Sequence, residues 1–180
     1  MKQLKVLINA YACSPSMGSE EGVGWNWCIH LAKYCELHII TEGEFRNEIE
    51  KALEDLPQKD NIFFYYNPVS NRIRSIAKNQ GDWRFYYYYK KWQKRTLEIA
   101  KNIITEHPID IMHQLNMIGF REPGYLFEIE GVPFVWGPIG GMKQFPIPFL
   151  KGEGLKMNLF FRLKNFLNLL QIRYSRRVDK

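Results

Sequence analysis

The stretch "LKVLINAYACSPSMGSEEGVGWNW", residues 4–27, decides the fold of this chain. Its "KVLINAY" segment (5–11) is a mostly apolar run of strand length, which is typical of a strand that a parallel sheet buries on both faces. The "MGSEEGVGWNW" segment (17–27) follows with three glycines and two glutamates. Glycines at this place allow close backbone approach to a ligand and unusual dihedral angles. We therefore expect a strand that leads into a glycine-rich loop and then into a helix.

The helix after the loop is predicted from the spacing of its apolar residues. Residues four, four and three positions apart lie along one helical face: Val23, Trp27, Leu31 and Tyr34. The rest of the chain alternates in the same way. Further strands are expected at 37–41, 61–68, 109–115 and 133–136, and further helices at 44–56, 82–105 and 155–173. Strands that alternate with helices favour an α/β fold with a Rossmann-like, doubly wound and mostly parallel sheet.

The composition is that of one globular domain. The chain has 180 residues, of which 46% are hydrophobic and 24% charged, and it has no Pro/Gly/Ser-rich tract. Its cysteines, Cys13, Cys28 and Cys35, form no CxxC motif and indicate no disulfide framework, which fits a reducing cytoplasm. Since no run of 18 uninterrupted apolar residues is present, we expect neither a membrane span nor an export signal.

Basic charge is concentrated in two segments. Residues 71–95 hold eight Lys or Arg against Asp82 alone, a net charge of +7, and residues 151–180 hold eight against two acids, a net charge of +6. The whole chain carries +6, so the other residues together carry −7. Such patches attract the phosphates of nucleotides, nucleic acids or anionic lipids. The first patch interleaves cations with aromatic residues, so single-stranded nucleic acid, an interfacial membrane contact and a solvated helix packed on the sheet all stay open.

The glycine-rich loop matches neither common phosphate-binding motif. Its spacing is GxxxGxG instead of the dinucleotide fingerprint GxGxxG, and no Lys-Ser/Thr pair follows as in a P-loop. Glu42 stands about 20 residues on, where a ribose-binding acid would stand, and we interpret this as a coincidence. A structural interpretation also stays open, in which Ser19 or Glu20 caps the helix, the glycines relieve crowding, and Trp25 and Trp27 belong to the core.

Three motifs resemble a known family. They are "GSEEGVGWNW" (18–27) after the first strand, "DIMHQLNMIGFREPG" (110–124) on and after a later strand, and "FVWGPIGG" (134–141) on the next strand. In their order and their placement at strand ends they resemble a subgroup of the retaining glycosyltransferases of the GT-B fold, family 4. The resemblance covers roughly residues 4–145.

The resemblance implies a two-domain enzyme whose N-terminal, Rossmann-like half binds mainly the acceptor. In this family the C-terminal half carries a glutamate pair in an EX7E pattern and holds most of a nucleotide-sugar donor, and we expect no such half within these 180 residues. Residues 1–150 would form the acceptor-binding domain, and residues 151–180 a basic amphipathic helix that leads toward the absent donor-binding domain. The chain by itself would then be inactive or nearly so.

The resemblance also implies site residues. Gly18, Ser19, Glu20 and Gly22 would stand at the interdomain cleft, with backbone amides near the donor's phosphates or the transferred sugar. Because a carboxylate repels a diphosphate, Glu20 or Glu21 would rather orient an acceptor hydroxyl or a basic side chain of the loop. His113 would stand at the end of its strand, face the transferred sugar and hydrogen-bond a hydroxyl; a core histidine bonded to a backbone carbonyl is the alternative.

Other positions depart from the family pattern or have a structural alternative. Many relatives carry a second histidine two residues after His113, where this chain has Leu115, which argues against a mechanism with two histidines. Arg121 would contact the acceptor or a phosphate, or else form an ion pair at a helix start. Gly140 and Gly141 would line the acceptor side with free amides, or else form a mere turn.

The chemistry that the resemblance implies needs no catalytic base, because the leaving diphosphate helps to deprotonate the acceptor during front-face attack. We expect no metal and no cofactor; a UDP- or GDP-linked sugar is the donor substrate, and a glycan or lipid-linked molecule is the acceptor. The resemblance suggests polysaccharide, lipopolysaccharide or glycolipid assembly in the cytoplasm, with peripheral contact to the inner face of the membrane and no nucleic acid. The rival function is a non-enzymatic α/β module that binds nucleic acid or an anionic membrane surface.

Overall fold

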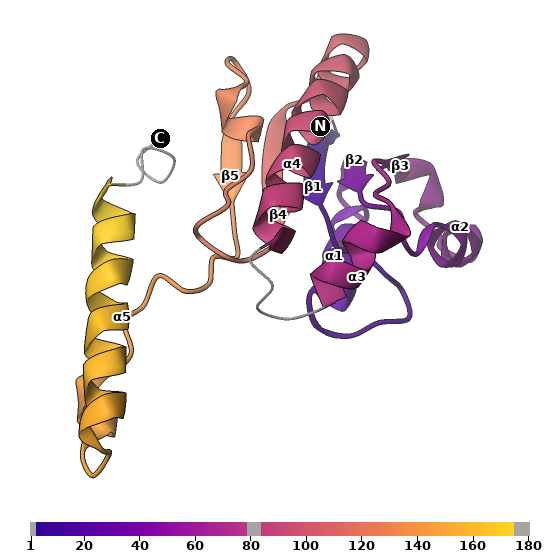
Figure 1. Ribbon diagram of the computed structural model, residues 1–180. Coiled ribbons are helices and arrows are strands. Elements are labelled where there is room, and N and C mark those ends of the chain that lie inside the picture. The colour runs from indigo at the N-terminus through magenta and orange to yellow at the C-terminus, as the bar shows by residue number, and fades with distance from the viewer. Residues whose placement is uncertain (1–2, 79–83, 175–180) are drawn as a thin grey trace. The chain divides into compact units, whose positions relative to one another are not determined.

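The computed structural model of the protein describes residues 3–78 and 84–174 and divides into two compact units (Figure 1). Unit 1 comprises residues 1–117 and 124–138, and unit 2 comprises residues 118–123 and 139–180. The helices and strands of unit 1 are β1 (Leu4–Ala10), α1 (Ser19–Leu31), β2 (Cys35–Thr41), α2 (Arg46–Glu54), β3 (Ile62–Tyr66), α3 (Asn71–Lys78), α4 (Arg84–Glu106), β4 (Ile111–Asn116) and β5 (Phe134–Trp136). Unit 2 contains one long helix, α5 (Leu155–Tyr174).

A five-stranded parallel sheet forms the centre of unit 1. Its strand order is β3-β2-β1-β4-β5, and Ile8 of the central strand β1 pairs with Ile39 of β2 on one side and with His113 of β4 on the other. The expected Rossmann-like α/β fold is therefore confirmed. The order reverses between β1 and β4, and in open α/β sheets ligands bind at the carboxyl ends of the strands beside such a switch point.

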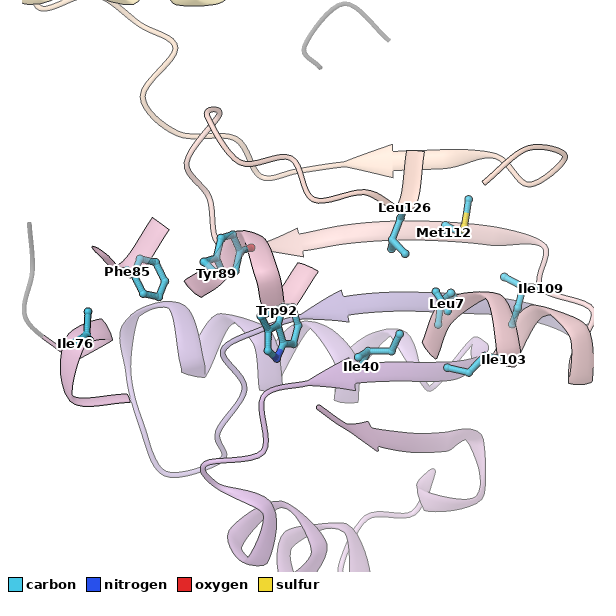
Figure 2. Packing of buried hydrophobic residues seen from close by; sticks show 11 residues of the cluster. Leu7, Ile40, Ile76, Phe85, Tyr89, Trp92, Ile103, Ile109, Met112 and Leu126 are labelled. Carbon is cyan, nitrogen blue, oxygen red and sulfur yellow. The ribbon is translucent and has the colours of Figure 1, made fainter. Parts of the chain in front are cut away.

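Helices bury both faces of the sheet. Leu7 and Ile40 point to one face, where they pack with Trp92 and other residues of α4 (Figure 2). Their neighbours Ile8 and Ile39 point to the other face and pack in the cluster that includes Cys28 of α1. Because successive strand residues alternate between faces, burial on both sides requires the continuous apolar runs seen in β1 and β2.

The strands lie within two residues of their expected bounds, but α1 begins four residues before the predicted start at Val23. Two glutamates, Glu20 and Glu21, stand in its first turn, where the helix dipole stabilises negative charge. The separate helix α3 is not among the expected elements. The predicted helix start at Asp82 lies outside the described residues.

Three residues of the expected apolar stripe, Val23, Trp27 and Leu31, lie on α1, and Tyr34 follows its end at Leu31. The stripe does not form the buried face. Val23 is 42% exposed, Trp27 45% and Tyr34 76%. The buried residues of α1 are instead Gly22, Gly24, Trp25 and Cys28. The interpretation of Trp25 as a core residue is confirmed and that of Trp27 is wrong, because the helix turns its small residues toward the sheet.

Helix α5 presents its apolar stripe outward. Leu159 is 70% exposed, Leu163 53% and Phe166 56%, whereas the buried residues of the helix are Asn165 and Asn168. The Asn165 side chain accepts a hydrogen bond from the backbone N–H of Phe145 and donates one to its carbonyl, both at 2.8 Å. Phe161 of the same helix stacks on Phe145 with ring centres 4.1 Å apart, so within unit 2 the helix is held by polar contacts and one aromatic stack and not by its leucines.

None of the described helices is long and apolar enough to cross a membrane. The three cysteines carry free thiols and are buried. Burial raises the pKa of Cys13 to about 12 and that of Cys28 well above its ordinary value, so neither thiol ionises near neutral pH.

Candidate functional site at the carboxyl edge of the sheet

Two of the glycines in the first motif allow α1 to pack against the loop that precedes it. A Cβ atom on Gly22 would lie 2.6 Å from the carbonyl oxygen of Met17, and one on Gly24 would lie 2.2 Å from that of Ala12. Side-chain carbons do not approach backbone oxygens so closely, so both positions require glycine. The interpretation that these glycines relieve crowding is therefore supported.

Gly18 differs from the other two. It occupies the N-cap position of α1, and no side chain forms a capping hydrogen bond there. The interpretation that Ser19 or Glu20 caps the helix is therefore wrong. It is exposed, and a Cβ placed on it would meet no atom within 4 Å. Packing does not require glycine here, and the space beside this helix N-terminus is open to a ligand.

Ser19, the first residue of α1, has a strained backbone. Its φ of 55° makes it the one non-glycine residue with positive φ in the described parts of the chain. A residue other than glycine held in this region costs on the order of 1–3 kcal/mol, and such strain is concentrated at functional sites. The side chain is exposed at the carboxyl edge of the sheet.

Asn116, the last residue of β4, connects the first two motifs. Its side-chain amide donates to the carbonyl oxygens of Ala12, at 2.7 Å, and of Glu20, at 3.3 Å. Its side-chain oxygen accepts the backbone N–H of Ala12 at 3.1 Å. One side chain therefore holds the loop after β1 and the start of α1 against the end of β4. Sequence reasoning did not single out Asn116.

His113 lies in the middle of β4 and not at its end, because the strand continues to Asn116. Its Nε2 lies 2.8 Å from the carbonyl oxygen of Gly137, so Nε2–H is the donor. The residue is 6% exposed, which supports the alternative of a core histidine bonded to a backbone carbonyl. Burial lowers the pKa of His113, an effect that the bond to Gly137 partly opposes. The ring is 5.6 Å from that of Trp27. Since Trp27 lies nine residues after Gly18, His113 stands about 14 Å along the helix axis from the helix N-terminus.

A buried polar network lies beneath the same edge. The side-chain amide of Asn9 donates to the side-chain oxygens of Gln93 and Gln114, each at 2.7 Å, and Gln93 donates to the hydroxyl of Tyr89. That hydroxyl in turn accepts the backbone N–H of Met117 at 3.1 Å. The network joins β1, α4 and β4 and so fixes the carboxyl end of β4. Its side chains are those of Asn, Gln and Tyr residues, and no spacing in the sequence indicates them.

The acid at the end of β2 is already engaged. The carboxylate of Glu42 accepts hydrogen bonds from the Arg74 guanidinium, the shortest at 2.8 Å, and from the backbone N–H groups of Val69 and Glu44. Glu42 is only 5% exposed, and its hydrogen bond with the guanidinium raises the pKa of Arg74. These partners support the interpretation that the resemblance of Glu42 to a ribose-binding acid is a coincidence.

A groove runs between α1 and the neighbouring strands of unit 1. It has a volume of about 900 Å³ and an almost entirely apolar lining. We call it the α1 groove; its lining residues include Val23, Trp27, Leu31, Ile111, His113 and Val135. The exposed stripe of α1 is one wall, so His113 shares a hollow with the helix of the first motif, although not with its N-terminus.

The remaining expected site residues belong to unit 2. The Arg121 guanidinium donates to the side-chain oxygens of Asn168, at 2.5 Å, and Gln171, at 2.7 Å, both on α5. The N–H of Gly140 donates to the carbonyl of Ile118 at 2.6 Å, so the expectation of a free amide at this position is wrong. Gly141 has a φ of 82°, which supports the alternative of a turn.

Comparisons of the chain with models of protein families, with curated proteins and with solved structures find no match.

Proposed function

We propose that the protein is the acceptor-binding, N-terminal domain of a retaining glycosyltransferase of the GT-B fold. One observation carries the proposal: hydrogen bonds connect the three motifs, the first of which lies far from the other two in the sequence. Asn116 of the second motif binds the backbone of Glu20 in the first. In the third motif, Gly137 accepts a hydrogen bond from His113 and donates its N–H to the carbonyl of Gln114 at 3.1 Å.

The position of these motifs supports a phosphate-bearing donor. The start of α1 follows the strand beside the switch point, and the first amides of a helix attract anions through their unpaired N–H groups and the helix dipole. Open space at Gly18 and the strained backbone of Ser19 fit an approach by the donor's phosphates. Glu20 lies beside this point and is assigned to the acceptor, because its charge opposes a diphosphate.

In this proposal His113 serves the substrate and not the phosphates. It lies deeper than the helix N-terminus, and its Nδ1 accepts a hydrogen bond from a sugar hydroxyl. Positioning of donor and acceptor, with the leaving diphosphate as proton acceptor, supplies the catalysis, so no metal or cofactor takes part. The donor is a UDP- or GDP-linked sugar, and the acceptor is a glycan or a lipid-linked molecule.

A matched pair of glycine variants tests the donor site. Gly18 and Gly154 each precede a helix, and each has open space where a Cβ would be added. In an assay of UDP or GDP release by the complete gene product with acceptor, Gly18→Asp should lower kcat/KM at least about 100-fold, because its carboxylate faces the diphosphate. Gly154→Asp should leave turnover unchanged.

Equal turnover of the Gly18→Asp variant and the unsubstituted protein would contradict the assignment of the start of α1 to the donor's phosphates. The gene sequence after Lys180 gives an independent check. A second βα domain with an EX7E pair there supports the proposal, and a stop codon favours a binding module.

A second proposal concerns the start of α4, where the structure favours a membrane surface over nucleic acid. Tyr86 and Tyr87 are 52% and 54% exposed, and the Lys91 ammonium lies 4.5 Å from the ring centre of Tyr87. Other aromatic residues of this segment, including Tyr89 and Trp92, are buried in the core and offer no stacking surface to bases. Exposed tyrosines beside lysines instead fit the interface of an anionic bilayer. Trp83 of the same segment lies outside the described residues.

Charge reversal at two exposed lysines of α4 tests this contact. In co-sedimentation with phosphatidylcholine vesicles that contain phosphatidylglycerol, Lys94→Glu should weaken binding about fivefold or more, because each cation near such a surface contributes about 1 kcal/mol. Lys101→Glu, further along the same helix, should bind like the unsubstituted protein. Equal binding to vesicles of phosphatidylcholine alone would contradict an electrostatic contact.

A further inference from the structure

A cluster of metal-ligand side chains lies at the amino edge of the sheet, opposite the carboxyl edge. Glu36 and His38 stand near the start of β2, and His107 follows the end of α4. The backbone N–H of Asp110, three residues later, donates to the carbonyl of Lys5 near the start of β1. Figure 2 shows Ile103 and Ile109, which flank the turn between α4 and β4, beside the starting ends of the strands.

The three side chains converge. Each offers one ligand atom, and these atoms all lie within 4.8 Å of one another. The imidazole rings of His38 and His107 have their centres 4.3 Å apart. Around a tetrahedral Zn²⁺ ion with ligand bonds of 2.0–2.1 Å, ligand atoms are about 3.4 Å apart, so small side-chain rotations would complete the site.

We propose that Glu36, His38 and His107 bind a Zn²⁺ ion, with water in the fourth position. Two imidazole nitrogens and a carboxylate oxygen form a ligand set that zinc prefers in proteins. The metal would connect the start of β2 to the turn between α4 and β4. This inference is independent of the proposed glycosyltransferase function.

The surroundings of His38 are those of an oriented ligand. The ring is fully buried, and it stacks on Phe63 with ring centres 5.3 Å apart. Its Nδ1 lies 3.0 Å from the hydroxyl of Tyr65, and its Nε2 faces the carboxylate of Glu36 at 3.0 Å. A hydrogen bond to the outer nitrogen of a ligating histidine fixes the ring so that the other nitrogen points at the metal. Tyr65 is in this position.

Lys5 competes with the metal. Its ammonium lies 2.7 Å from the same carboxylate oxygen of Glu36 that faces His38. The Lys5 ammonium repels a divalent ion and is bound to the Glu36 oxygen that would ligate the metal. The affinity for Zn²⁺ should therefore be moderate. The competition also supplies a test in which a substitution strengthens binding, an outcome that simple damage to the fold would not give.

The experiment uses the untagged 180-residue chain and Co²⁺, whose visible absorption reports tetrahedral coordination, followed by displacement with Zn²⁺. One equivalent should bind. His107→Ala should weaken binding at least about tenfold, while His30→Ala, a change at an exposed histidine outside the cluster, should leave it unchanged. Lys5→Met, which keeps the aliphatic stem, should tighten binding at least about threefold.

Three results would overturn the proposal: no saturable Co²⁺ spectrum, equal affinity in His107→Ala and the unsubstituted chain, or a strong thiolate-to-cobalt band that places the ion on a cysteine. Circular dichroism of each variant separates loss of a ligand from loss of the fold. If the His107→Ala variant unfolds, the Lys5→Met variant alone tests the metal site. If Lys5→Met does not bind Co²⁺ more tightly than the unsubstituted chain, the site is refuted.

Discussion

At the scale of single residues, the glycines of the first motif have separate roles that stability measurements can distinguish. Alanine normally stabilises a helix interior by about 1 kcal/mol relative to glycine. At Gly24, however, the added methyl group meets the Ala12 carbonyl at 2.2 Å and the Asn116 amide at 3.2 Å. We expect Gly24→Ala to lower the free energy of unfolding by about 1–3 kcal/mol in urea titrations. Gly18→Ala, where the methyl group meets nothing and the cost comes from the poorer N-cap preference of alanine, should lower it by less than about 1 kcal/mol. A stabilising Gly24→Ala would show that α1 stands further from the loop.

The burial of His113 predicts how the stability of the fold depends on pH. Its pKa in the folded chain is lowered by burial, while in the unfolded chain it lies near 6.5. Above that value both states hold a neutral ring. As the pH falls below about 6.5, the unfolded state takes up a proton that the folded state does not, so stability declines by at most about 1.4 kcal/mol per pH unit from this group. Between about pH 7.5 and 5.5, His113→Gln should therefore lose less stability in urea titrations than the unsubstituted chain. Equal losses of stability in His113→Gln and in the unsubstituted chain would show that titratable groups other than His113 cause the decline.

The residues that organise the candidate site were only partly predictable from the sequence. His113 was found because histidine is chemically conspicuous and the motif carries it. Asn116 and Gln93 were not found, because an amide side chain reveals its role only through the backbone atoms and partners that the fold brings to it. Glu36 and His107 are 71 positions apart, and their proximity depends on the pairing of β1 with β2 and with β4.

At the scale of elements, the two tryptophans of α1 should differ in their contribution to stability. Trp25 is 6% exposed and stacks on Phe64 with ring centres 6.4 Å apart, whereas Trp27 is 45% exposed on the wall of the α1 groove. Trp25→Ala should cost about 3–5 kcal/mol of the free energy of unfolding. Trp27→Ala should cost less than about 1.5 kcal/mol. Urea titration followed by circular dichroism measures both, and equal costs would mean that the groove wall is covered in solution.

The comparison of expected and observed elements shows which signals are reliable. Strands buried on both faces read as continuous apolar runs, so β1 and β2 were located from hydrophobicity alone. The face that α1 buries was not, because it consists of glycine, cysteine and one tryptophan, and the more regular apolar stripe faces the groove. Periodicity detects a helix, but it identifies the packed face only where large side chains make the contact.

The two units differ in the number of buried apolar side chains that stabilise their helices. This difference should appear in hydrogen exchange. Helix α4 buries eight of its side chains, among them Trp92, Leu97 and Ile103. In unit 2, the described hydrophobic residues that are buried are Phe120 and Leu150, and α5 buries only Asn165 and Asn168. The one close ring stack of α5 on the rest of unit 2, among the described residues, is that of the half-buried Phe161 on Phe145, and α5 fully buries none of its apolar side chains. A helix of 20 residues with so little apolar packing is marginally stable in water, so α5 should open without unfolding of the sheet.

Exchange followed by mass spectrometry should therefore give slow amides in the centre of α4, at residues 92–103, and amides at least about 100-fold faster in the centre of α5, at residues 159–170. The two helices have similar lengths, 23 and 20 residues, so length does not explain such a ratio. If α5 is as protected as α4, its exposed leucines are covered in solution. Repeating the measurement at tenfold lower protein concentration then separates a second copy of the chain, whose protection is lost on dilution, from a contact within the chain, whose protection is kept.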